Sequence, residues 1–190
     1  STRIYVATVA SLQGKSELFQ LIPFEVAIID EASQLLEPSL AGLLTKFKKT
    51  ILIGDHMQLP AVSVQPAAMS KIKPGKEWCQ RIGLTDMSMS YFERMYRLYQ
   101  DRGWHHLIGI LHEQGRMHQD IMRCVNEEVY RGELRLVDPT RQGVSMDQVF
   151  VEASAPLFKN RLIFVAAQPT LAETYLKTNQ EEAEITIALI

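Results

Sequence analysis

Cysteine is scarce in this sequence, with only Cys79 and Cys124 among 190 residues. The two stand far apart and form neither a C-x-x-C pair nor a zinc-ligand spacing. A disulfide-stapled scaffold is therefore not expected. This sparing use of thiols favours an intracellular protein of the cytoplasm or nucleus.

The sequence also lacks an excess of charge and a long apolar run. The formal net charge is −2, so the total does not indicate a nucleic-acid binder, although a local basic patch fits within it. No apolar stretch is long enough to cross a membrane, and no signal pattern opens the chain, so no membrane association is expected. With 46% hydrophobic residues, the chain can form one full domain, or one domain and part of another.

Short apolar runs alternate with segments of helical periodicity. The runs are rich in valine, isoleucine and leucine without polar alternation, which is typical of strands buried on both faces of a parallel sheet. The expected strands are 4–10, 26–30, 50–53, 106–111 and 162–166. The expected helices lie within 33–49, 87–101, 118–130 and 178–190, the last capped by Thr178 or Asn179. The alternation predicts an α/β fold with parallel strands.

Two irregular stretches, 61–87 and 131–160, interrupt this pattern. We expect residues 1–158 to form part of one domain and residues 159–190 the start of another, with the boundary at 158–161. The chain opens almost directly into an expected strand and stops inside an expected helix. Both ends therefore look cut, and a longer parent protein is expected.

A buried strand runs into two carboxylates in the stretch VAIIDEAS, residues 26–33. Ligands of open parallel sheets bind beyond the carboxyl ends of the strands, so Asp30 and Glu31 come to the binding edge. One carboxylate can hold Mg²⁺ through its water shell, and the other can orient a water for attack on phosphorus, which is Walker B chemistry. Because the motif is short, a strand ending in a solvated acidic turn that caps the next helix stays open as the alternative.

A second strand repeats this geometry in TILIGDHMQLPAV, residues 50–62. One helix and a turn separate the two strands, so they can lie side by side, with Asp55 and Gln58 at the edge that carries the first two carboxylates. The neutral amide of Gln58 can contact a phosphate oxygen and the attacking water together. Pro60 is expected to stiffen the chain as it leaves this edge.

A third polar cluster, with Arg116 at its centre, follows the run HLIGIL in the stretch LHEQGRMHQDI, residues 111–121. An arginine beside a γ-phosphate stabilises the charge that develops during phosphoryl transfer. Taken alone, this arginine is more simply explained as a helix-start residue paired with a nearby acid.

In order and spacing, these stretches resemble a superfamily 1 helicase, in the branch that includes the nonsense-mediated decay RNA helicase. IIDEAS resembles motif II of that branch, and IGDHMQLPAV, which contains Gly54–Val62, resembles motif III. EQGRMHQDI resembles motif IV, which normally reads Gln-Tyr-Arg-Met-His-Pro. The resemblance extends over nearly the whole chain. It implies a RecA-like, P-loop NTPase fold, incomplete here, with the beginning of a second RecA-like domain.

The resemblance implies a role for each motif residue. Asp30 would coordinate Mg²⁺, Glu31 would be the catalytic base, and Gln58 and Arg116 would contact the γ-phosphate of ATP, with Gln114 in support. VATVAS, residues 6–11, resembles a motif that meets the backbone of single-stranded DNA or RNA. The implied nucleotide-binding set is Asp30, Asp55, Gln58, Gln114 and Arg116, and the implied nucleic-acid-binding set is Thr8, Ser11, Lys15 and Pro60.

The chain departs from the family pattern beside the arginine. Gly115 stands where the family usually has tyrosine, and Gln119 where it has proline. Losing the tyrosine removes an aromatic contact and is expected to leave the backbone looser around Arg116.

The sequence contains no G-x-x-x-x-G-K-[ST] loop. Its nearest match, SLQGKSEL at residues 11–18, has Val9 where the first glycine belongs, so we interpret it as the end of the nucleic-acid motif. Without phosphate-cradling amides and a lysine, the isolated chain is expected to be inactive, whereas the parent would be an ATP-dependent helicase. Two alternatives stay open: a non-hydrolysing, helicase-like binding or scaffold module, and an unrelated P-loop ATPase that shares only Walker B.

Overall fold

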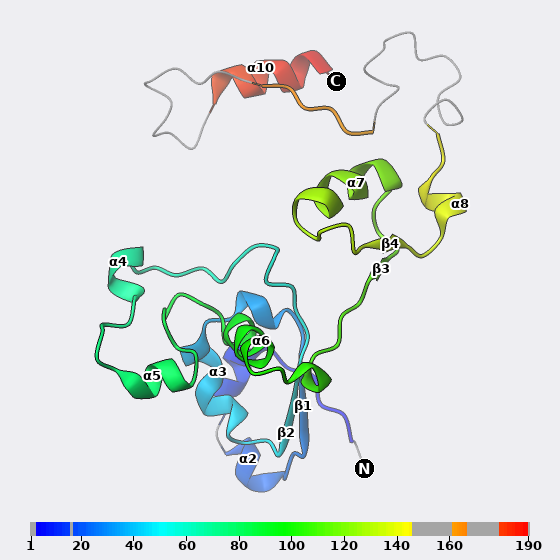
Figure 1. Cartoon of the computed structure of the whole chain (residues 1–190). Coiled ribbons are helices and arrows are strands. Elements are labelled where there is room, and N and C mark those ends of the chain that lie inside the picture. Colours follow the sequence, from blue (N-terminus) through cyan, green and yellow to red (C-terminus); the bar gives the residue numbers. More distant parts are fainter. Residues whose placement is uncertain (1–2, 16, 146–160, 167–178, 190) are drawn as a thin grey trace. The chain divides into compact units, whose positions relative to one another are not determined.

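The computed structural model describes residues 3–15, 17–145, 161–166 and 179–189, which pack as two compact units, Ser1–Ile110 and Leu111–Ile190 (Figure 1). The elements of the first unit are α1 (Val9–Gln13), α2 (Leu18–Leu21), β1 (Val26–Ile29), η1 (Ala32–Gln34), α3 (Glu37–Leu44), β2 (Lys49–Leu52), α4 (Ala67–Ser70), α5 (Glu77–Arg81), α6 (Tyr91–Asp101) and η2 (His105–Leu107). Those of the second unit are β3 (Glu113–Gln114), α7 (Gln119–Glu128), β4 (Arg135–Leu136), α8 (Pro139–Gln142) and α10 (Gln180–Leu189). No helix in these ranges has both the length and the apolar character needed to cross a membrane.

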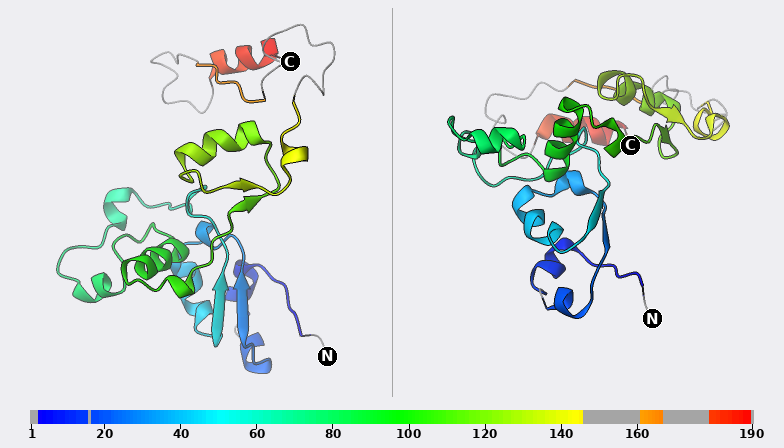
Figure 2. Two further views of the ribbon diagram at one scale, coloured as in Figure 1. Left: turned by 45° about the vertical axis from the view of Figure 1, so that its right-hand side comes forward. Right: turned by 60° about the horizontal axis from the view of Figure 1, so that its bottom comes forward.

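Strands β1 and β2 pair in parallel, as the sequence predicted, in a register that runs from Val26 opposite Lys49 to Ile29 opposite Leu52 (Figure 2). Backbone bonding continues past both strands, because the amide of Ile53 donates to Ile29 O at 2.8 Å. The carboxyl ends of the two strands therefore lie together at one edge.

The core of the first unit lies between the sheet and its helices. Ile29, Ala32 and Leu40 are buried, and Tyr91 and Phe92 of α6 pack against them. The expected burial of both sheet faces is not seen among the described residues, since Ile28 is 66% exposed while Ile29 is 8% exposed. The packed elements cover one face of these two strands.

A buried ion pair ties α6 to α3. Arg94, 6% exposed, donates from Nε and Nη2 to the two carboxylate oxygens of Glu37, each at 2.6 Å. Its remaining nitrogen, Nη1, donates to Ile82 O in the turn after α5. One guanidinium thus joins three segments, in the bidentate geometry that suits carboxylate recognition.

Three expected strands are wrong. Residues 4–10 have no ladder partner in the described chain, and Thr8 instead caps α1 by accepting from the amide of Ser11. Residues 106–111 begin in η2, where the amide of Ile108 donates to His105 O. Residues 162–166 are not in a strand either.

The four expected helices are confirmed as α3, α6, α7 and α10. Polar caps fix the starts of two of them: Ser90 Oγ accepts from the amide of Glu93 at α6, and Asn179 Oδ1 accepts from the amide of Glu182 at α10. Thr178, the other cap candidate, and residues 158–160 of the expected domain boundary lie outside the described residues.

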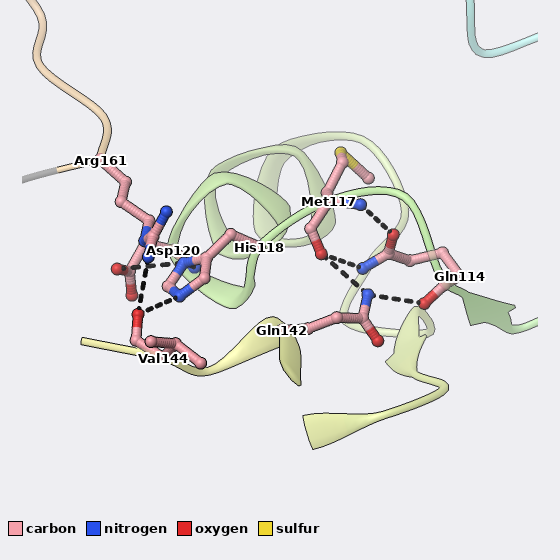
Figure 3. A network of polar contacts seen from close by, with 7 residues as sticks. All are labelled: Gln114, Met117, His118, Asp120, Gln142, Val144 and Arg161. Carbon is pink, nitrogen blue, oxygen red and sulfur yellow. Dashed lines mark hydrogen bonds and ion pairs between the residues drawn. The ribbon is translucent and has the colours of Figure 1, made fainter. Parts of the chain in front are cut away.

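The second unit contains two short parallel strands that the sequence did not indicate. Glu113 of β3 pairs with Arg135 of β4, and Gln114 pairs with Leu136. Between them run α7 and a tight turn. Asn126 of α7 donates from Nδ2 to Leu134 O, and its Oδ1 accepts from the amide of Leu134. The chain then enters α8, which lies beside the loop between β3 and α7 (Figure 3).

Candidate functional site

The chain turns sharply where β1 ends in two acids. Asp30 Oδ1 accepts from the amide of Glu31 at 3.0 Å, and Glu31 adopts a left-handed backbone with φ of 51°. This conformation is uncommon for a residue with a side chain and is typical of tight or functional turns. Both carboxylates are exposed, and Glu31 Oε2 accepts from Gln34 Nε2 at 3.0 Å. The turn thus delivers two accessible carboxylates beyond the strand.

A close contact locks this turn to the end of β2. The amide of Ala32 donates to Ile53 O at 2.8 Å, and Ser33 Oγ accepts from the amide of Asp55 at 3.2 Å. A Cβ at Gly54 would lie 2.9 Å from the backbone nitrogen of Ser33, too close for any side chain. Ser33 and Gly54 are positioning residues to which sequence reasoning gave no role, although a glycine just before a strand-end acid was a signal.

Asp55 organises the loop that follows β2. Its Oδ1 accepts from the amide of Met57 at 2.9 Å, and its Oδ2 accepts from Gln58 Nε2 at 2.8 Å. Asp55 is partly buried, whereas Gln58 is exposed. The structure therefore brings the acids of the first strand end and the Asp55–Gln58 pair to one edge, as expected.

This edge has the chemistry of a magnesium–phosphate site. In the part of the chain that the structure describes, no three His, Cys, Asp or Glu side chains converge on one point. Mg²⁺ does not need such a cage, because it keeps several waters and binds through one or two carboxylates plus substrate phosphates. Asp30 and Glu31 supply carboxylates of that kind, and Gln58 supplies a neutral amide.

The residues expected to face nucleic acid are exposed. Thr8 Oγ1 and Ser11 Oγ lie 2.8 Å apart at the start of α1, which ends at Gly14. Lys15 follows the end of this helix, whereas a P-loop lysine opens one, so the SLQGKSEL stretch has the wrong geometry for a P-loop. Pro60 is exposed on the loop that follows β2 and Asp55.

The second unit presents Arg116 on the loop between β3 and α7, which we call the arginine loop (residues 115–118). Gln114 Oε1 accepts from the amide of Arg116 at 3.0 Å. Gln114 Oε1 also accepts from the amide of Met117 at 2.7 Å, and Gln114 Nε2 donates to Met117 O at 3.0 Å (Figure 3). Arg116 is exposed and forms no ion pair with the described acids, so the alternative of a paired helix-start arginine is not seen.

The backbone of this loop is not loose, contrary to the expectation from Gly115. Gln142 of α8 donates from Nε2 to Gln114 O at 3.0 Å and to Met117 O at 2.8 Å. His118 caps α7, with its Nδ1 accepting from the amide of Asp120. Sequence reasoning missed Gln142, and no motif in the chain pointed to it.

Two family models, each described as an AAA domain, match the chain, one over residues 1–66 and the other over residues 87–190. The second match alone covers more than half of the sequence. The chain belongs to the AAA-domain family of superfamily 1 helicases. The helicase resemblance of its motifs is thereby confirmed, and the unmatched residues 67–86 lie within the stretch expected to be rich in loops.

Curated helicase relatives match across both units. The chain is 34% identical over 127 residues to the DNA-binding protein SMUBP-2 of Rattus norvegicus, covering 67% of this chain and 11% of that protein. It is 30% identical over 146 residues to an uncharacterized ATP-dependent helicase of Methanocaldococcus jannaschii, covering 77% and 18%. It is 31% identical over 117 residues to the DNA replication ATP-dependent helicase/nuclease DNA2 of Mus musculus, covering 62% and 9%. The chain thus spans less than a fifth of the length of these relatives.

Proposed function

We propose that this chain is part of the motor of an ATP-dependent nucleic-acid helicase. The observation that carries the proposal is the carboxylate edge: the acids after β1 and the Asp55–Gln58 pair after β2 share it, in a chain of the AAA-domain helicase family. Phosphoryl transfer needs little covalent chemistry from a protein, and positioned charge and a positioned water do most of the work.

At this edge, each side chain has a distinct task. Asp30 holds Mg²⁺ through its water shell, and Glu31 takes the proton of the water that attacks the γ-phosphate of ATP. Asp55 holds Gln58 by the 2.8 Å bond, and Gln58 contacts the phosphate and links hydrolysis to movement on the nucleic acid. Because the Asp30 and Glu31 carboxylates are exposed, a nucleotide and its metal can reach them.

Arg116 supplies a positive charge in addition to that of Mg²⁺. Its exposed guanidinium reaches the γ-phosphate and stabilises the charge that develops in the transition state. Gln114 supports it through the two backbone amides that it binds.

The nucleic acid is single-stranded DNA or RNA; its phosphates meet Thr8, Ser11 and Lys15, and Pro60 lies along the same path. These residues are exposed, and hydroxyl and ammonium groups are the usual partners of phosphate oxygens. Two of the relatives are named for DNA binding and DNA replication, which supports a nucleic-acid substrate.

The domain assignment and the inactivity of the isolated chain belong to the same proposal. Residues 1–158 form the later part of a first RecA-like domain, and residues 159–190 begin a second. The phosphate-binding loop is absent from the 190 residues, so the purified chain should neither bind nor hydrolyse ATP measurably. Hydrolysis by this chain alone would contradict the proposal.

The test of the catalytic assignment uses the helicase that carries this chain together with a phosphate-binding loop. Replacing Glu31→Gln removes the base and should lower nucleic-acid-stimulated ATP turnover by about 10²–10⁴-fold. The matched control is Glu25→Gln, since Glu25 lies at the opposite end of β1 and pairs on the surface with Lys48 at 3.1 Å. Unchanged turnover in Glu31→Gln would remove Glu31 from the reaction. Nucleic-acid binding without any ATP turnover in the unaltered protein would favour the scaffold alternative.

A further inference from the structure

The arginine loop rests on a buried glutamine from elsewhere in the sequence. Gln142, at the end of α8, is 8% exposed and lies 28 positions beyond Gln114 in the chain. Figure 3 shows its side chain directed toward the backbone oxygens of Gln114 and Met117. A polar side chain this well buried is stable only when its hydrogen-bonding groups find partners.

Every hydrogen-bonding group of the Gln142 amide is used. Nε2 donates to Gln114 O at 3.0 Å and to Met117 O at 2.8 Å, while Oε1 accepts from the amide of Asp138 at 2.9 Å. The two carbonyls bracket Arg116, so one NH₂ group spans the loop. With the bonds from Gln114, the peptide groups before and after the arginine are fixed.

The segment that carries Gln142 is itself anchored. Asp138 Oδ1 accepts from the amides of Thr140 and Arg141 and so caps α8. At its other end, a Cβ on Gly143 would lie 2.6 Å from Pro139 O, a distance that only glycine allows. Residues 138–144, which we call the strap, therefore have a defined path beneath the loop.

A second contact joins the strap to the start of α7. Val144 O accepts from His118 Nε2 at 2.9 Å and from Arg161 Nη2 at 2.9 Å (Figure 3). Because the Val144 carbonyl can only accept, His118 Nε2 carries the proton of this bond, while Nδ1 lies beside the amide of Asp120 and 3.3 Å from its Oδ2. The strap thus bonds to Gln114, just before the arginine loop, and to Met117 and His118 within it.

We propose that Gln142 is a positioning residue for Arg116, whose side-chain amide clamps the carbonyl groups on either side of that arginine. The inference rests on the proposed function, in which Arg116 meets the γ-phosphate. The clamp fixes the backbone and leaves the guanidinium free to reach a nucleotide.

The first experiment tests the clamp without ATP, by amide hydrogen exchange on the 190-residue chain. Gln142→Glu keeps the volume but replaces the donating NH₂ with an oxygen, so the carbonyls of Gln114 and Met117 lose their partner. Exchange at the amides of Arg116 and Met117 should accelerate roughly tenfold or more. The matched control is Gln100→Glu, an exposed glutamine of α6, which should leave both amides unchanged. Unchanged exchange in Gln142→Glu would overturn the clamp.

A measurement on the unaltered chain keeps the test valid if Gln142→Glu does not fold. The side-chain NH₂ protons of Gln142 should exchange slowly, because both donate inside the second unit. The uncharged Gln142→Met variant provides the same comparison without a buried charge. Fast exchange of the Gln142 NH₂ protons would overturn the proposal.

The second experiment is a double-mutant cycle on ATP turnover in the helicase that carries a phosphate-binding loop. Gln142→Met should lower kcat roughly tenfold when Arg116 is intact. It should lower kcat by less than about twofold when Arg116→Ala is already present. Equal losses in the two backgrounds would show a merely structural role and overturn the positioning. If Arg116→Ala alone leaves turnover intact, the proposed role of the arginine fails, and amide exchange still decides whether the clamp exists.

Discussion

The carboxylate edge of the first unit and the arginine loop of the second are held by different means. At the edge, backbone bonds join the two strand ends: Ile53 bonds to Ile29 and Ala32 bonds to Ile53, and Gly54 lies against Ser33. Side chains such as Ser33 and Asp55 add bonds to nearby amides. In the loop, the side-chain amides of Gln114 and Gln142 bind the backbone. An edge of the first kind is sensitive to added volume, whereas a loop of the second kind is sensitive to the loss of a hydrogen-bond donor.

The largest expected effect comes from the ion pair that supports the first unit alone. Replacing Arg94→Met leaves the Glu37 carboxylate, whose side chain is only 16% exposed, without its cation. The change should lower the free energy of unfolding of this unit by about 3–5 kcal/mol. Both tryptophans, Trp78 and Trp104, lie in the first unit, so denaturant unfolding followed by tryptophan fluorescence reports on it selectively. Amide exchange in α7, which belongs to the second unit, serves as the internal control. A loss below about 1 kcal/mol would show that the pair behaves like a surface pair.

Adding one methyl group should have different effects on stability at the carboxylate edge and in the arginine loop. Gly54→Ala places a Cβ 2.9 Å from the Ser33 backbone nitrogen and should cost about 1–3 kcal/mol of stability in the first unit. The matched control is Gly115→Ala in the arginine loop, where a Cβ meets nothing within 4 Å and φ is not positive. That change should stay within about 0.5 kcal/mol. Equal effects of the two changes in urea unfolding would contradict the comparison.

The smallest expected effect is a pH dependence of the strap. A hydrogen bond from the Thr140 hydroxyl, aided by the amide of Arg141, lowers the pKa of Asp138 below its ordinary value of 3.8. Since the pKa is lower in the folded state, the stabilisation is present above the ordinary value and is lost as the pH falls through the folded pKa. Protection of the Thr140 and Arg141 amides should therefore fall as the pH drops below the ordinary value of 3.8.

Asp138→Asn should remove most of this pH dependence, because the carboxylate that titrates is gone. Asp101→Asn, at the exposed end of α6, is the matched control and should leave the dependence at the strap intact. A protection profile that stays flat in the unaltered chain would rule out Asp138 as the acid-sensitive group of the strap.

The sequence predicted the parts of the structure whose cause is local. Residues 26–29 and 50–52 are short apolar runs that end at Asp30 and at Gly54-Asp55, and both form strands in the expected parallel order. Residues 4–10 are equally apolar but do not form a strand, because the Thr8 side chain caps a helix at that point. Apolar composition alone does not distinguish a strand from a segment without a pairing partner.

The arginine loop was predictable only in part. Arg116 and Gln114 lie within one short motif, so their proximity could be inferred. Gln142 bonds to Gln114 O from 28 positions away. The strands that lead to the two segments pair over only two residues, and strands this short carry no periodicity. Contacts of that kind depend on tertiary packing, which no local pattern records.

The left-handed backbone of Glu31 has a consequence for drift among relatives. A side chain at φ of 51° is strained, and glycine or asparagine would relieve that strain at this position. Stability alone would therefore replace this glutamate, whereas the catalytic role proposed for it would retain the carboxylate. Under that proposal, a lineage in which hydrolysis is no longer under selection should lose Glu31 early, while the glycine contact at position 54 persists.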